Sequence, residues 1–168
     1  MKKLFFTLLL AVISITSVNA QSKMGHVNSQ KVLDTIPSRK AAIAEISMIE
    51  QMGVKELTDM DSTLQTMIAY YQSHPEWSDL VKRSYEGQIR DLQTRIQGRE
   101  QTIDRDLQVL SAELNKKTLD LVKKAVNTVS TAKKLNYVID ESVLLFNSGG
   151  TDITNEVITE VLRLDAIK

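Results

Sequence analysis

The sequence predicts a mainly helical α+β protein, in which a small β-sheet body carries a long antiparallel coiled-coil hairpin as an arm. Residues 77–134 contain no proline and repeat apolar side chains at roughly heptad spacing. A second helical run, residues 38–71, precedes them, and Pro75 lies in the break between the two. At about 1.5 Å per residue the longer helix would reach roughly 85 Å. Because that length exceeds the diameter of a compact domain of this size, most of the chain is expected to be extended.

The first twenty residues have the composition of a secretory signal peptide. Lys2 and Lys3 precede an apolar stretch over residues 4–18, and small residues end at Ala20. The apolar stretch is short for a membrane span, and an uncleaved anchor is the alternative. We therefore expect export, with cleavage after Ala20, and a single mature unit of residues 21–168 without a transmembrane segment.

The mature chain is weakly acidic and poor in aromatic residues. Without the two leader lysines it has 19 basic and 21 acidic side chains, which argues against a general nucleic-acid binder. The absence of cysteine excludes disulfides, thiolate chemistry and lipidation at a cysteine. Many Glu, Gln, Lys and Leu with few aromatic residues are typical of coiled coils.

The predicted body combines the two ends of the mature chain, residues 21–36 and 135–168. Residues 24–27 predict a short strand, and Asn28 or Ser29 can cap a helix over residues 30–36. Pro37 suits the first turn of a further helix, because the donor that proline lacks has no partner there.

The C-terminal segment predicts the remaining body elements. The β-rich runs 136–140 and 143–147 indicate a hairpin, and residues 151–154 offer several caps for a final helix. So small a body normally needs partners, and without cysteine or a metal site oligomerisation is the expected route. The body residues that are candidates for this assembly are Val27, Tyr137, Val138, Ile139, Leu144 and Phe146.

The predicted arm spans residues 37–134, with its tip near residues 71–77. On its first helix the repeats give a seam at Ile43, Glu50, Leu57, Leu64 and Tyr71, with Ile46, Gly53, Met60 and Met67 between them. Glu50 and Gly53 do not fit an apolar seam and predict a loose or bent point. Ser73 and Glu76 have the spacing of a capping box, which predicts that the return helix begins there.

Catalysis finds no support in the sequence. The two histidines, His26 and His74, stand apart, and no Gly-x-Ser-x-Gly elbow or P-loop is present. The Gly149-Gly150 pair is interpreted as a turn between a strand and a helix. No catalytic, cofactor-binding or metal site is predicted, and the protein is expected to act by binding.

Two surfaces are candidates for that binding. Methionine and aromatic side chains near the tip adapt to irregular apolar partners, although packing within the hairpin is the alternative. Lysines on the return helix can form a stripe that binds an anionic ligand or is simply solvated. The candidates for apolar binding near the tip are Met60, Met67, Tyr70, Tyr71 and Trp77, and the stripe consists of Lys116, Lys117, Lys123 and Lys124.

The two ends of the chain resemble the Skp/OmpH family of periplasmic chaperones. Residues 25–33 (GHVNSQKVL) look like the opening strand and helix of that family. Residues 135–140 (LNYVID) and 149–157 (GGTDITNEV) look like its closing strands and helix. The arm matches only as a coiled coil.

The resemblance implies a periplasmic homotrimer whose arms surround a cavity and hold unfolded outer-membrane proteins without ATP. Skp-like proteins tend to be basic whereas this mature chain is slightly acidic, so no lipopolysaccharide site is carried over. The alternative is an oligomeric envelope scaffold or adaptor that binds one specific partner through its arms. Such a scaffold would depend on a few residues, for example Tyr71 or Trp77.

Overall fold

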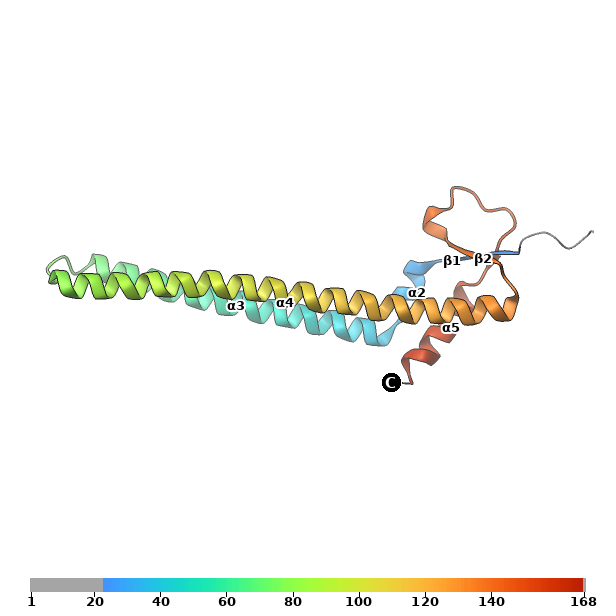
Figure 1. The fold of residues 1–168 in the computed structure, drawn as a ribbon, viewed down its shortest axis with the longest axis horizontal. Coiled ribbons are helices and arrows are strands. Elements are labelled where there is room, and N and C mark those ends of the chain that lie inside the picture. The colour runs from blue at the N-terminus through green and yellow to red at the C-terminus, as the bar shows by residue number, and fades with distance from the viewer. Residues whose placement is uncertain (1–22, 168) are drawn as a thin grey trace, which may run out of the picture. The chain divides into compact units, whose positions relative to one another are not determined.

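A computed structural model describes residues 23–167 and confirms a mostly helical protein with a small sheet. The expected signal peptide lies outside the described residues. The chain divides into two compact units: unit 1 comprises the residues up to Ile36 and from Leu121 onward, and unit 2 comprises Pro37–Asp120. The elements in order are β1 (Met24–Val27), α2 (Ser29–Thr35), α3 (Pro37–Gln72), α4 (Asp79–Lys133), β2 (Tyr137–Asp140), the 3₁₀ turn η2 (Glu141–Val143), β3 (Thr151–Asp152) and α5 (Thr154–Asp165) (Figure 1).

Unit 1 contains a parallel three-stranded sheet of order β2-β1-β3. In the register of β1 with β2, Gly25 lies opposite Val138, and in the register of β1 with β3 it lies opposite Thr151. The expected hairpin of residues 136–140 and 143–147 is therefore wrong. Both partners of the central strand come from distant parts of the chain, as parallel pairing requires.

The end of β2 explains why the second run of β-forming residues is not a strand. The Asp140 carboxylate accepts a hydrogen bond from the backbone N–H of Ser142 at 2.8 Å, which turns the chain into η2 and away from the sheet. Residues 144–147 then form irregular structure, and the chain returns to the sheet only at β3.

The core of unit 1 lies where α2, α5 and the C-terminal part of α4 meet β1. Asn28 caps α2 as expected, because its side chain accepts from the backbone N–H of Lys31 at 2.9 Å. The backbone N–H of Asn28 also donates to the Thr154 hydroxyl at 3.0 Å, which ties the end of β1 to the start of α5. The buried apolar side chains of this core are Val27, Val32, Ile36, Ala125, Ile153, Val157 and Val161.

The C-terminal end of α4 leads the chain directly into β2. The backbone N–H of Leu135 donates to the carbonyl of Ser130 at 2.9 Å, and that of Lys134 donates to Thr131 at 3.1 Å. This pair of bonds is the Schellman arrangement. Lys134 has the left-handed backbone conformation that the Schellman motif requires, with a φ of 55°.

In unit 2, α3 and α4 lie side by side and run antiparallel. Gly53 contacts Ile103, Glu56 pairs with Arg99, and Tyr71 bonds to Glu86. As the residue number increases along α3, the number of the partner residue on α4 decreases, which shows that the two helices are antiparallel. Leu64 is buried on the expected seam of α3, and Ile103 of α4 is buried as well. That the pair supercoils, as the heptad spacing suggests, stays a prediction.

Gly53 is not the loose point that the sequence suggested. α3 continues unbroken through residue 53, and the glycine is buried where the two helices approach closely. A Cβ atom at this position would lie 3.0 Å from both Cδ1 and Cγ2 of Ile103. The residue is therefore explained by close packing.

The return helix begins at Asp79, five residues after His74, which would be its first residue if Ser73 were the cap. The Ser73 hydroxyl donates to the carbonyl of Tyr70 at 2.8 Å, so it serves the end of α3 and not the start of α4. None of the helices in residues 23–167 combines the length and the apolar character that a bilayer crossing requires.

Candidate functional site

The tip of unit 2 gathers five rings into one cluster, here called the aromatic tip. Three of its members, Tyr70, Tyr71 and Trp77, are candidates from the sequence, and the structure brings them together. The ring centroids of Tyr70 and Trp77 are 5.6 Å apart, and those of Tyr71 and Trp77 are 6.5 Å apart. His74 stacks on Trp77 at 4.8 Å with an interplanar angle of 24°, and the ring of Tyr85 lies 5.1 Å from that of Trp77.

Hydrogen bonds fix the cluster at both helices. The Tyr71 hydroxyl donates to Glu86 Oε1 at 2.5 Å, and this bond raises the pKa of Tyr71 above its ordinary value. Lys82 donates to the carbonyl of Pro75 at 2.7 Å. Tyr70 remains about half exposed, so the aromatic tip presents ring surface to solvent on a defined framework.

Both methionines that were predicted alongside these rings lie on α3. Met60 lines a groove between α3 and α4 together with Met52, which the sequence interpretation missed. Met67 is half-buried on α3. Met52 lies next to Gly53. A glycine at a seam position leaves space between two helices, and this was the feature of the sequence that could have predicted the groove.

A bidentate ion pair joins the two helices beside this groove. Arg99 Nε lies 3.0 Å from each oxygen of the Glu56 carboxylate, and Arg99 Nη2 lies 2.8 Å from Oε2. Hydrogen bonding from Arg99 lowers the pKa of Glu56. The fork geometry fixes the register of α3 against α4.

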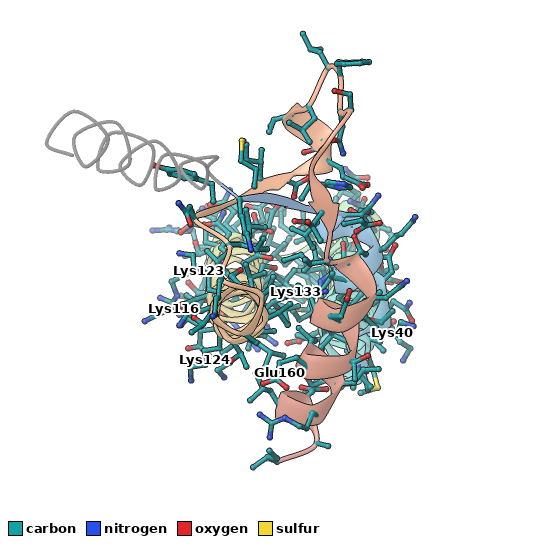
Figure 2. The ribbon with its side chains drawn as sticks, turned by 90° about the vertical axis from the view of Figure 1, so that its right-hand side faces the viewer. Lys40, Lys116, Lys123, Lys124, Lys133 and Glu160 are labelled. Atoms are coloured by element: carbon teal, nitrogen blue, oxygen red, sulfur yellow. The ribbon has the colours of Figure 1, made fainter. Side chains whose placement is uncertain are left out.

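The lysine stripe lies along α4. Figure 2 shows Lys123 and Lys124 on the side of α4 away from α5, whereas Lys133 lies on the side that faces it. The Lys133 ammonium pairs with Glu156 of α5 at 2.6 Å, and Lys117 pairs with Glu113 at 3.7 Å. Anion binding by the stripe stays a prediction.

The trimer-body candidates differ in accessibility. Val27 is buried in the core of unit 1, whereas Val138, Ile139 and Leu144 are half-buried. Tyr137 of β2 and Phe146 of the loop after η2 are mostly exposed, and one residue of β1 and two that follow β2 add further exposed apolar side chains. The large apolar side chains exposed in this part of unit 1 are Met24, Tyr137, Val143, Leu145 and Phe146.

A histidine and two carboxylates meet in unit 1. His26 Nδ1 lies 2.8 Å from Glu141 Oε1, and the ligand-type atoms of His26, Glu141 and Asp152 lie within 4.8 Å of one another. In the described part of the chain these are the residues that could hold a metal ion together. Asn28 and Thr154 already donate to the two carboxylates, so the group is explained as a tie between β1 and the segments that follow β2.

Asp152 gives unit 1 a sensitivity to acid. Bonds from the Thr154 side chain and from its backbone N–H, the latter at 2.8 Å, lower the pKa of Asp152 below the ordinary 3.8. A lowered folded-state pKa contributes stability that is present above the ordinary value and is lost as the pH falls through the folded value.

We expect Asp152→Asn to lower the melting temperature of unit 1 by about 5 °C near pH 6. Toward about pH 2 the effect of the same change should become smaller, because the wild-type carboxyl group is increasingly protonated as the pH falls. Circular dichroism melts at the two pH values measure the difference. Asp34→Asn, on the exposed face of α2, is the control, and an equal loss from Asp152→Asn at both pH values would contradict the interpretation.

Comparisons with known proteins agree with this architecture. A family model described as "Outer membrane protein (OmpH-like)" matches residues 23–161. The "Skp-like protein" of Chlamydia pneumoniae is 25% identical over 161 residues, which cover 94% of each chain. "Chaperone protein Skp" of Salmonella typhimurium (strain LT2) is 25% identical over 163 residues, covering 96% of this chain and 99% of that relative.

A solved structure supports the fold independently. The crystal structure of an OmpH-like protein from Caulobacter crescentus CB15 superposes with a TM-score of 0.74 at 15% sequence identity, covering 89% of this chain and 87% of that one. The fold is that of a chain with a long helix pair and a small parallel-sheet unit. The chain belongs to the OmpH-like outer membrane protein family, as the match over residues 23–161 shows.

Proposed function

We propose that this protein is an ATP-independent holdase that binds unfolded outer-membrane proteins during their passage through the envelope. The observation that carries the proposal is the match of nearly the whole chain to relatives named "Chaperone protein Skp". The surfaces of unit 2 support it, because flexible methionines and solvent-facing rings tolerate varied apolar partners.

The proposal includes an exported protein that works as a homotrimer in the periplasm. The exposed apolar side chains near Phe146, which is 81% exposed, supply a surface for assembly through unit 1. Three linked arms raise the effective concentration of weak binding surfaces around one client. Individually poor contacts on the arms can then retain an unfolded chain.

Size-exclusion chromatography with light scattering tests this function. The mature protein alone should elute with the mass of three chains. After a urea-unfolded β-barrel protein is diluted into it without nucleotide, a soluble complex of three chains and one client should appear. A protein that stays monomeric, or a client that is lost to aggregates while the trimer elutes unchanged, would contradict the proposal.

The aromatic tip favours the alternative of a specific scaffold enough to warrant its own test. A specific interface would concentrate its binding energy in a buried anchor such as Trp77. A holdase distributes it, so we expect Trp77→Ala to weaken client binding only about two- to threefold. Titration of a labelled client, followed by fluorescence anisotropy, measures the change, with Gln72→Ala at the exposed end of α3 as the control. Loss of binding by a hundredfold or more would favour the scaffold.

A further inference from the structure

The arm helices form a groove at mid-length that the sequence candidates describe only in part. Its volume is about 700 Å³, and its apolar lining comes from Ile49, Met52, Gly53, Met60 and Ile103. Met52 is 65% exposed, so its side chain is available to a ligand.

The close approach at Gly53 shapes the floor of this groove. Because the glycine has no side chain, Ile103 of α4 packs against the backbone of α3, and a Cβ atom there would meet it at 3.0 Å. The floor is therefore one isoleucine side chain and bare backbone. The flexible thioethers of Met52 and Met60 beside it can adapt to apolar groups of different shape.

The rim of the groove is charged but largely balanced. Lys55 Nζ lies 3.6 Å from Asp59 Oδ2, and Arg99 holds Glu56 in the bidentate pair described above. Asp106, the fifth charged residue of the lining, has its Oδ1 3.5 Å from Arg105 Nη2. Since each charged side chain of the lining has a partner of opposite sign, the groove offers no unpaired charge to a ligand. An apolar floor between paired charges suits an uncharged side chain whose neighbours along the chain are polar.

A strand of an outer-membrane β-barrel has this character, because its apolar and polar residues alternate. In an extended unfolded segment, one apolar side chain can enter the groove while its polar neighbours point toward the rim and solvent. We infer that the groove beside Gly53 binds single apolar side chains of extended, alternating segments from unfolded outer-membrane proteins. The inference rests on the proposed holdase function and names the feature of the client that this part of the arm recognises.

Two methionines on α3 provide a matched test. Met52 lines the groove, whereas Met48 does not line it and is nearly as exposed, at 57%. Both changes to serine replace exposed side chains of one helix, so folding is expected to survive in each. The probe is a fluorescein-labelled peptide that alternates leucine with serine and threonine, and its comparison is a peptide of the same composition with the leucines in one block.

We expect Met52→Ser to weaken binding of the alternating peptide about fivefold in fluorescence anisotropy. Met48→Ser should change it less than twofold, and the block peptide should bind wild type several-fold more weakly than the alternating one. Equal effects of the two substitutions, or equal binding of the two peptides, would overturn the inference.

Further measurements separate this inference from the proposed function. If wild type keeps a urea-unfolded β-barrel protein soluble while Met52→Ser and Met48→Ser bind the peptide equally, the groove assignment fails and the holdase stands. If wild type does not keep the client soluble, the proposed function itself fails. A second copy of this chain is the alternative occupant of the groove, and sedimentation velocity tests for it. A change of assembly state in Met52→Ser alone would also overturn the inference.

Discussion

Replacing Val157 by aspartate should unfold unit 1. The valine is fully buried on α5, in the same core as Val32 of α2 and Ala125 of α4. A carboxylate placed there has no partner and must either be protonated or open the core. We expect a loss of about 4 kcal/mol or more in the free energy of unfolding, which is a large fraction of the stability of a unit this small.

Hydrogen exchange read by mass spectrometry measures this result. Amides of β1, α2 and α5 should lose protection in Val157→Asp, whereas those of α3 around Leu64 should keep theirs. Thr159→Asp is the matched control, because it adds the same charge to the same helix at an exposed position. Full protection of β1 and α5 in Val157→Asp would show that this core does not hold unit 1 together.

Replacing Gly53 by leucine should destabilise the helix pair of unit 2 by about 2–3 kcal/mol. Even a Cβ atom at this position would approach Ile103 to 3.0 Å, and a larger side chain must force the helices apart or Ile103 into a strained rotamer. Gly53→Ala should have a small net effect, since its gain in helix propensity of about 1 kcal/mol is opposed by this contact. Thermal unfolding followed by circular dichroism measures both.

Two other glycines make the prediction specific. Added Cβ atoms at Gly87 and Gly98 of α4 meet nothing within 4 Å, so alanine at either should stabilise the helix by about 1 kcal/mol. Ile103→Ala removes all three side-chain atoms that a Cβ atom at Gly53 would meet. It should make room for alanine there, so that the double variant is more stable than the sum of the single changes predicts. Stabilisation of Gly53→Ala equal to that of Gly98→Ala would contradict the close packing.

Local signals in the sequence predicted the helix boundaries that depend on neighbouring residues. Asn28 caps α2 through a bond to a residue three positions away, and Pro37 begins α3. The prediction that Ser73 caps the return helix was wrong because a serine hydroxyl can bond either to a preceding carbonyl or to the N–H groups of a following helix. Here it bonds to the carbonyl of Tyr70. Spacing alone does not distinguish between these two bonds.

Features that depend on distant pairing were harder to predict. The runs near residues 140 and 145 indicated a hairpin, but β1 lies between β2 and β3 and pairs in parallel with both. Tyr85 was missed because its contact with the aromatic tip depends on the register of α3 against α4. The same register places Ile103 opposite Gly53 and shapes the groove beside Met52.

The most direct measurement of the central claim is the aggregation of a urea-unfolded β-barrel membrane protein, diluted into increasing amounts of the mature protein without nucleotide. A holdase should suppress light scattering progressively and reach full effect near three chains per client. Unchanged scattering at severalfold excess of the folded protein would contradict the holdase function and direct attention to a single specific partner.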